Sequence, residues 1–266
     1  MRRERLREAI SLGYHAVAAD GPQYLSLRPS TFEAQLEILR RLGFGGGTRD
    51  DLWRLAEGRK LDGPRAFLTF DDGFADTFTA AAPMMAERGL SGMVFVLPGH
   101  LATGAPLDWP EVTGEARRRP ATMTSMDWDM AASLAESGWE IGSHTMTHPR
   151  LTTLGDEELR QELRDSRRIV AERLGRCEVL SYPFGAWNDR VAAAAADAGY
   201  SFAFTLPLGA QMRVGRLSMP RLTIDDRDTP VRFRIKLTRA GRLALLSPLR
   251  PAARALRRPA PHSHAD

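Results

Sequence analysis

Two adjacent carboxylates, Asp71 and Asp72, follow directly after the apolar run 66–70. Active sites of parallel β/α barrels lie at the carboxyl ends of the strands, so acidic residues at the end of an apolar strand are suitably placed for chemistry. Two neighbouring carboxylates repel each other, and burying both without a partner is costly, whereas a bound cation removes that cost. The pair runs into Gly73, and Asp-Gly is also a common turn dipeptide. On its own, the Asp71–Asp72 pair is therefore equally consistent with a simple turn and with a functional site.

A second cluster of ligand-type residues ends another apolar run. His144 and His148 follow residues 139–143 and lie four residues apart. That spacing places both imidazoles on one side of a helical turn, where they can share a metal ion. Two histidines and one carboxylate leave coordination positions open for water and substrate, which a catalytic site needs and a structural site lacks. The two clusters together favour a centre for one divalent metal, with Zn2+ as the preferred ion.

The strands that must position these residues are expected where the chain is continuously apolar. Parallel strands covered on both faces give such runs rather than strict alternation. Seven runs meet this description: residues 11–17, 66–70, 93–97, 139–143, 179–182, 201–206 and 217–224.

Helical patterns separate the apolar runs. Ser30 and Glu33 form a capping-box pattern that predicts a helix start, with the helix ending near Gly43. Four further helices are each followed by a glycine, the usual C′ signal: residues 76–88, 127–137, 156–174 and 189–198. Residues 104–120 are expected to be an irregular insertion. The alternation of strands and helices predicts an α/β fold with a closed or nearly closed parallel barrel.

The net charge of +4 is unevenly distributed. Residues 229–266 contain nine basic residues and one acidic residue, whereas residues 1–228 are mildly acidic overall. Basicity confined to a tail argues against a nucleic-acid groove in the folded body. We therefore expect a barrel over residues 1–228 and a basic, partly helical tail over 229–266 with a poorly ordered end.

The tail has an amphipathic pattern. Phe233, Leu237, Ala240 and Ala244 fall on one helical face, with arginines nearby. Residues 229–258 could therefore contact an anionic membrane, where an enzyme would meet a lipid-linked sugar. A final helix packed on the barrel with a solvated basic rim explains the pattern equally well.

Nothing at the start of the chain indicates export. The first ten residues mix both charge signs, and Gly13, Tyr14 and His15 interrupt the next stretch, which makes a poor signal-peptide core. No run approaches the roughly 18 apolar residues of a spanning helix. Cys177 is the only cysteine, so no intrachain disulfide is possible and no oxidising compartment is implied. The sequence favours a cytoplasmic or membrane-peripheral protein.

Three stretches together resemble the motifs of a known family. Residues 69–73 (Thr-Phe-Asp-Asp-Gly) and 144–148 (His-Thr-Met-Thr-His) are similar to the first two motifs of the polysaccharide deacetylases, the NodB-homology group or carbohydrate esterase family 4. Residues 181–185 (Ser-Tyr-Pro-Phe-Gly) resemble the third. The resemblance covers roughly residues 10–225 and implies a distorted (β/α)7 barrel. It also implies a metal-dependent hydrolase that removes N-acetyl groups from an amino sugar in a glycan or lipid-linked saccharide, releasing acetate.

The resemblance also implies roles for particular residues. Asp71 would be the catalytic base, and Asp72 would bind the metal together with the two histidines, His144 and His148. In the third motif, the backbone N–H of Phe184 would help to hold the oxyanion. Tyr182 and Pro183 would lie beside the substrate with it.

The chain departs from the family pattern at two places. The third motif usually begins with an arginine, where this chain has Ser181, and no histidine follows in the final motif near residues 220–225. Residues 13–17 (Gly-Tyr-His-Ala-Val) instead resemble the opening of the circularly permuted subgroup that contains poly-N-acetylglucosamine deacetylases. First and last strands are neighbours in a closed barrel, so His15 is the predicted general acid. A half-buried strand histidine with a backbone partner is the alternative.

Other readings stay open at this point. The missing third-motif arginine is compatible with a catalytically weak glycan-binding module, and the same fold could also deacylate a small N-acyl compound. Trp128 and Trp187 could form a platform for a sugar or belong to the core. His100 is expected in a loop, and His262 and His264 in the tail are expected to be inert.

Overall fold

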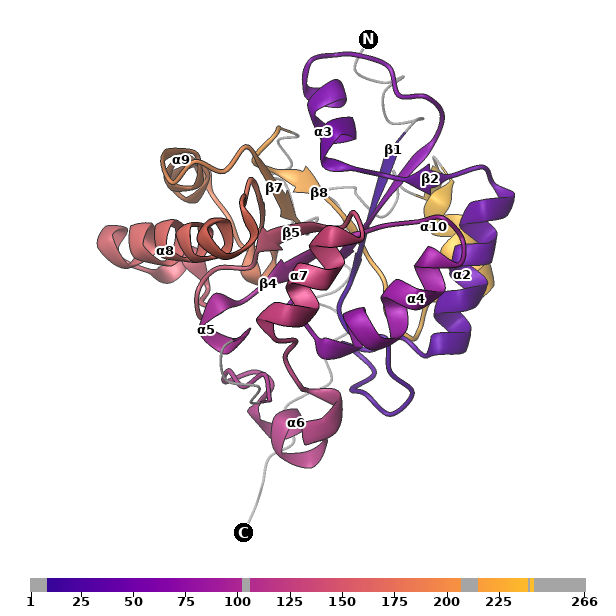
Figure 1. Ribbon diagram of the computed structural model, residues 1–266, viewed down its shortest axis with the longest axis horizontal. Helices are drawn as coiled ribbons and strands as arrows, with labels where there is room; N and C mark the ends of the chain where they lie inside the picture. The colour runs from indigo at the N-terminus through magenta and orange to yellow at the C-terminus, as the bar shows by residue number, and fades with distance from the viewer. Residues whose placement is uncertain (1–8, 102–105, 207–214, 239, 242–266) are drawn as a thin grey trace.

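The computed structural model describes residues 9–101, 106–206, 215–238 and 240–241. Its centre is a curved parallel sheet surrounded by helices (Figure 1). The strands are β1 (Ala9–Tyr14), β2 (Gly45–Gly46), β3 (Arg65–Phe70), β4 (Met93–Val96), β5 (Glu140–Ser143), β6 (Val179–Ser181), β7 (Phe202–Thr205), β8 (Met219–Pro220) and β9 (Leu222–Thr223). The α-helices are α2 (Pro29–Arg41), α3 (Arg49–Ala56), α4 (Ala82–Ala86), α5 (Pro98–Leu101), α6 (Thr113–Arg118), α7 (Trp128–Glu136), α8 (Asp156–Leu174), α9 (Asp189–Asp197) and α10 (Pro230–Leu237).

One extended stretch nearly closes the sheet into a barrel. The strand order is β8-β7-β6-β5-β4-β3-β1-β9, with β2 paired to β3 and all pairs parallel. Only Arg221 separates β8, which pairs with β7, from β9, which pairs with β1. Its N–H donates to the Thr205 carbonyl at 2.9 Å, and the Ile224 N–H donates to the Gly13 carbonyl at 2.8 Å. With β8 and β9 counted as one strand, and with β2 left out because it pairs only with β3 and lies off this path, seven strands form the barrel, and the predicted (β/α)7 barrel is confirmed.

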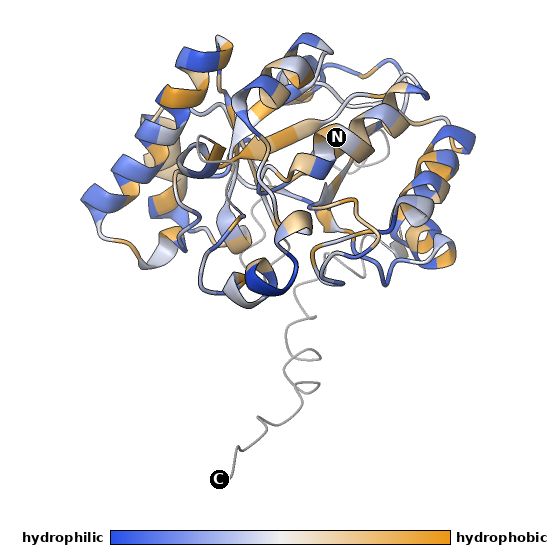
Figure 2. Cartoon of the chain, turned by 60° about the horizontal axis from the view of Figure 1, so that its bottom comes forward, coloured by the Kyte–Doolittle hydropathy of each residue, from blue (hydrophilic) through white to orange (hydrophobic). Residues whose placement is uncertain are grey.

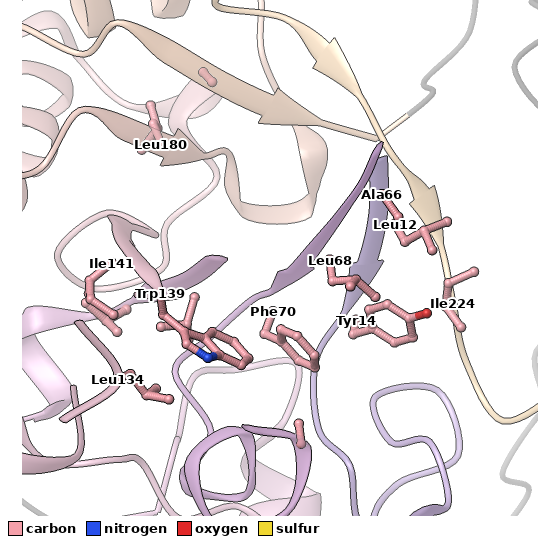
Figure 3. Close-up of a cluster of buried hydrophobic side chains, with 14 of the residues drawn as sticks. Leu12, Tyr14, Ala66, Leu68, Phe70, Leu134, Trp139, Ile141, Leu180 and Ile224 are labelled. Atoms are coloured by element: carbon pink, nitrogen blue, oxygen red, sulfur yellow. The ribbon is translucent and has the colours of Figure 1, made fainter. Parts of the chain in front are cut away.

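Side-chain alternation along β3 divides the interior of the protein into two layers. Ala66, Leu68 and Phe70 belong to the layer between the sheet and the surrounding helices (Figure 3), where the Phe70 ring stacks on Tyr14 at 5.3 Å between centroids. Phe67 instead belongs to the cluster that also contains Phe95, Phe202 and Phe204. Successive strand residues point to opposite faces, so the residues two and four positions beyond Phe67 also face the barrel interior.

The outer helices follow the sequence expectations closely, with three exceptions. The predicted capping box of Ser30 and Glu33 is wrong, because α2 begins at Pro29 with Arg28 as an N-cap that makes no side-chain hydrogen bond. A capping box is found instead at Thr48, before the unpredicted helix α3. The predicted helix 76–88 is split into a π-helical turn, Thr77–Ala81, and α4. In Figure 2 the central strands are mainly hydrophobic, whereas the helices carry residues of both kinds.

The insertion at 104–120 is more regular than its sequence predicts. It contains α6, and the side chains of Leu107, Trp109 and Val112 are buried. These three side chains form a separate hydrophobic cluster with Phe74, which lies two residues after Asp72. The insertion therefore packs over the carboxyl end of the barrel.

The described part of the basic tail packs on the barrel. Phe233 and Leu237 of α10 are buried, and the helix lies against α2 (Figure 1). Lys236 donates to an Asp228 carboxylate oxygen at 2.6 Å. These contacts favour the packed-helix reading for α10, whereas the expected poorly ordered end, with His262 and His264, lies outside the described residues. No helix in the described ranges is long and apolar enough to cross a membrane.

Candidate metal centre and active site

Three predicted metal ligands meet at the carboxyl end of the barrel. Asp72, His144 and His148 are buried, and each offers a ligand atom within 4.8 Å of the other two. The Asp72 Oδ1 atom lies 3.2 Å from His144 Nε2 and 3.4 Å from His148 Nε2. This oxygen is inaccessible to solvent and has no hydrogen-bond partner. A buried, unsatisfied carboxylate oxygen facing two imidazole nitrogens suits a divalent cation, so the residues present fit the metal.

The strand end of β5 orients His144. Its N–H donates to the Val96 carbonyl at 2.8 Å, and its ring Nδ1 lies 2.7 Å from the carbonyl oxygen of Ser181. That contact requires the proton on Nδ1, which leaves the Nε2 lone pair facing Asp72. Metal-binding histidines typically donate their second ring nitrogen in this way. The third-motif strand therefore supports the centre through its backbone.

The backbone around the ligands is held in an uncommon conformation. Asp72 and His148 have φ angles of 70° and 64°, and Thr145 between the two histidines has a φ of 73°. Non-glycine residues rarely adopt this left-handed region, and such strain is concentrated at functional sites. The Glu162 carboxylate stabilises the turn by accepting hydrogen bonds from the N–H groups of Met146 and Thr147, at 2.8 and 3.1 Å.

Aromatic rings enclose His148. Its centroid lies 4.1 Å from that of Trp109, which comes from the insertion, and 4.7 Å from that of Phe184. Burial lowers the pKa of His148 to about 3, so the imidazole is neutral, the form that binds metals. Sequence reasoning missed Trp109. The apolar residues around it were the available signal, because a solvated insertion would not need them.

The predicted base, Asp71, forms a buried ion pair that the sequence did not predict. Both Nη atoms of Arg221 donate to the Asp71 carboxylate, at 2.8 and 2.7 Å. The two side chains are only 7% and 1% exposed. Burial alone would raise the pKa of Asp71, but the charge of Arg221, followed by that of His144, lowers it well below its usual range. Asp71 is therefore held as a carboxylate.

His15 lies beside the carboxylate pair. The register of β1 and β3 matches Tyr14 with Phe70, and the Asp71 N–H donates to the Tyr14 carbonyl at 2.9 Å, which brings His15 next to Asp71. His15 is half-buried, and its charge is one of the minor influences that lower the pKa values of both carboxyls. The predicted general acid, His15, therefore comes from the first strand of the barrel and lies beside the candidate metal site.

A half-buried acid, Asp76, anchors the loop after His15. The Val17 N–H donates to Asp76 Oδ1 at 2.9 Å. Burial raises the pKa of Asp76 to about 6, even though the hydrogen bond from Val17 opposes the shift. Asp76 follows the acidic pair by only a few residues, so it joins this loop to the metal-binding segment.

The third motif, residues 181–185, contributes to the site mainly through its backbone, because the Tyr182 side chain is buried in the core. Tyr182 is 1% exposed, and its hydroxyl donates to the Leu217 carbonyl at 3.0 Å, which places this side chain in the core. Pro183 is buried, and Phe184 follows with a φ of 59°. The Arg150 guanidinium lies 4.3 Å from the Phe184 ring centroid, on the exposed side of the site. Contact of this motif with a substrate stays a prediction.

The weaker candidates lie in the surroundings of the site or in the outer layers. His100 belongs to α5 rather than to a loop, and its ring centroid lies 6.3 Å from that of Trp109. Burial lowers the pKa of His100. Trp128 and Trp187 are partly buried against the main hydrophobic core, which favours the core reading over a sugar platform.

Sequence comparisons agree with these motifs. Residues 58–203 match the family model for polysaccharide deacetylase. YxkH of Bacillus subtilis, which carries the name of a polysaccharide deacetylase, is 24% identical over 204 residues, covering 76% of this chain and 66% of its own length. A chitooligosaccharide deacetylase of Sinorhizobium fredii is 27% identical over 139 residues, covering 51% of this chain and 54% of its own. The chain thus spans less than two thirds of the length of either relative.

Solved structures share the fold. The Streptococcus pyogenes deacetylase PplD, solved with acetate, superposes with a TM-score of 0.72 at 21% identity, covering 87% of this chain and 98% of that one. IcaB from Ammonifex degensii has a TM-score of 0.69 at 19% identity, covering 85% and 94% of the two chains. At these identities the structures show the barrel architecture alone. The family match, which extends over more than half of the chain and contains all four motif residues of the metal centre and base, shows that this chain belongs to the polysaccharide deacetylase family.

Proposed function

We propose that this chain is a metal-dependent deacetylase that hydrolyses the N-acetyl group of an amino sugar in a glycan or lipid-linked saccharide, releasing acetate. One observation carries the proposal: three buried ligand groups converge within 4.8 Å, directly beside a carboxylate that is held ionised. The relatives named as chitooligosaccharide and polysaccharide deacetylases support an N-acetylated saccharide as the substrate class.

Asp72, His144 and His148 would hold one divalent ion. When bound, such an ion lowers the pKa of water and polarises the acetamide carbonyl group. Zinc suits a set of two histidines and one carboxylate with open positions, although other divalent ions compete for such sites. The hydrogen bond from His144 to the Ser181 carbonyl, and the rings packed on His148, would keep the two imidazoles in place.

Asp71 is the residue that accepts the proton of the attacking water. Its carboxylate lies next to the metal ligands in sequence, and its pKa is lowered, so it is ionised throughout the neutral range. The two hydrogen bonds from Arg221 leave one lone pair on each carboxylate oxygen for the water. A general base must be ionised and oriented, and the ion pair provides both, while the lowered pKa makes Asp71 a weaker base than a free carboxylate.

His15 is the residue that protonates the departing amine. It reaches the site from the end of β1, on the side of Asp71 that adjoins the closing strand. The Phe184 N–H would hold the oxyanion that develops on the carbonyl group, an interaction that typically contributes several kcal/mol. The left-handed conformation of Phe184 turns the backbone sharply at this point.

The test combines metal content with product release. Purified protein would be analysed for bound metal, and acetate release would be measured from neutral chitooligosaccharides, peptidoglycan fragments and lipid-linked N-acetyl sugars. The proposal expects about one ion per chain and release of acetate from at least one saccharide. His144→Ala should abolish both. Saturable sugar binding by the metal-loaded protein without acetate release would support a glycan-binding module. Acetate release only from small N-acyl compounds would support a deacylase of such compounds.

A further inference from the structure

Arg221 reaches the catalytic end of the barrel from the strand that closes it. Apart from its two contacts with Asp71, the Arg221 Nη1 atom donates to Thr69 Oγ1 at 2.9 Å and Nη2 donates to Ser181 Oγ at 2.8 Å. Thr69 in turn donates to the Leu12 carbonyl at 2.8 Å, which directs its lone pairs to the guanidinium. A single side chain therefore joins β3, β6 and the closing stretch.

The barrel interior is shaped for this guanidinium. The Cζ atom of Arg221 lies 5.6 Å from the ring centroids of both Phe95 and Phe204, whose faces favour a cation. A Cβ atom added to Gly13 would lie 3.6 Å from Arg221 Cζ and Nε. A side chain longer than alanine at this position would therefore collide with the guanidinium.

Ser181 lies where the family motif usually has an arginine. Its side chain is fully buried and accepts from Arg221, while its carbonyl accepts from the His144 ring. An arginine side chain from position 181 would have to enter the space that the Arg221 guanidinium occupies. The small hydroxyl at position 181 leaves this space to the Arg221 guanidinium and accepts a hydrogen bond from it.

We propose that Arg221 is a positioning residue for Asp71, and that this chain has moved the supporting guanidinium from the third-motif strand to the closing strand. The inference rests on the proposed function, in which Asp71 is the base. Its physical ground is the forked geometry of arginine, which fixes the plane of a carboxylate through two parallel hydrogen bonds. The base is then correctly oriented only when the stretch between β8 and β9 is in its place.

Four variants of the full-length protein test the proposal: Arg221→Met, Arg221→Lys, Arg221→Ser and the exchange variant, which combines Ser181→Arg with Arg221→Ser. Arg221→Met should lower kcat by about 100-fold with little change in KM, as expected when a reacting group is misplaced. Arg221→Lys keeps the charge without the fork and should recover part of that loss. The exchange variant should recover kcat to within roughly tenfold of the original, because it returns a bidentate donor. Zinc affinity, measured by calorimetry with Zn2+ alone, should stay within a few-fold throughout, since Arg221 touches none of the three ligands.

An Arg221→Met variant that keeps kcat within threefold would overturn the proposal, and so would one that loses zinc binding together with turnover, because the damage would then extend to the whole site. If Arg221→Met does not fold, the proposal is tested by comparing the kcat of the exchange variant with that of Arg221→Ser. A folded, zinc-binding exchange variant whose kcat stays as low as that of Arg221→Ser would also overturn it.

A stability measurement separates this inference from the proposed function. If the original protein releases no acetate from any substrate, the proposed function fails. Whether a guanidinium from position 181 can replace that of Arg221 can still be tested by thermal unfolding. Ser181→Arg and Arg221→Ser should each lower the melting temperature singly and restore much of it in combination. Additive losses in the exchange variant would overturn the relocation of the guanidinium. A matched control, Glu172→Gln, removes the exposed pair of Arg168 and Glu172 on α8 and should leave the melting temperature nearly unchanged.

Discussion

Replacing Asp71 with asparagine should reduce stability as well as activity, although the substitution removes no volume. The side chains of Asp71 and Arg221 are 7% and 1% exposed, so water cannot replace the lost charge. In Asp71→Asn, one Nη of Arg221 keeps an oxygen acceptor. The other, now 2.7 Å from the carboxylate oxygen, would face an amide NH2 group and lose its partner.

The expected magnitude follows from this geometry. Removing one partner of a buried ion pair costs about 3–5 kcal/mol, because the remaining charge is left in a poorly solvating interior. For a domain of this size that loss corresponds to a fall of about 6–20 °C in melting temperature, at roughly 2–4 °C per kcal/mol. Turnover should be lost while the metal is retained, since the three ligands are unchanged.

The assay is urea denaturation of the metal-free protein in the presence of a chelator, combined with thermal unfolding. A second variant, Asp71→Leu with Arg221→Met, replaces both charges with apolar side chains and should recover most of the stability, as buried pairs often do. A loss below about 1 kcal/mol in Asp71→Asn would refute the argument that the pair is buried and mutually dependent. Full acetate release by Asp71→Asn would in addition remove the assignment of Asp71 as the base.

Three further predictions concern other residues. His15→Ala should lower the rate and remove the basic limb of the pH–rate profile, and an unchanged profile would exclude His15 as the general acid. The pKa of Asp76 is raised to about 6; since the unfolded value is near 4, the folded protein holds this proton more tightly, and the contribution of Asp76 to stability falls as pH rises from about 4 to about 6. Asp76→Asn should flatten that part of the stability–pH curve measured by urea denaturation, whereas an identical curve would contradict the burial argument. Co-sedimentation with liposomes of anionic lipid at low salt should disappear on deletion of residues 242–266, which leaves the packed helix α10 in place, and no binding by the full chain would end the membrane prediction.

The barrel strands and the convergence of Asp72, His144 and His148 could be predicted because their signals are local. Continuous apolar runs mark strands buried on both faces, and a glycine after each of four helices gives the helix ends within a few residues. These residues follow two such runs, so the parallel arrangement alone brings Asp72 and His144 to one end of the sheet. The capping prediction failed at Ser30 because Pro29, with its fixed φ, already starts the helix.

The ion pair could not be predicted from the same signals. Arg221 lies 150 residues from Asp71 and sits within a short apolar run, where it has no local pattern to indicate that it faces the interior. Arg221 reaches Asp71 only when the barrel closes, and closure is a property of the whole fold. Trp109 was missed for a related reason, because only the three-dimensional path of the insertion places its ring on His148. The capping box at Thr48 and Asp51, by contrast, was present in the sequence and could have been found.

The ring of Trp109 lies 4.1 Å from that of His148, and the chain has only five tryptophans. Indole fluorescence responds to the charge and electronic state of a ring packed against it, so metal binding beside His148 would change the emission of this one residue. The protein thus carries a natural fluorescent probe beside His148, one of the three proposed metal ligands. Comparison with Trp109→Phe would isolate its signal, so that ion binding and exchange could be followed in real time without a label or a substrate.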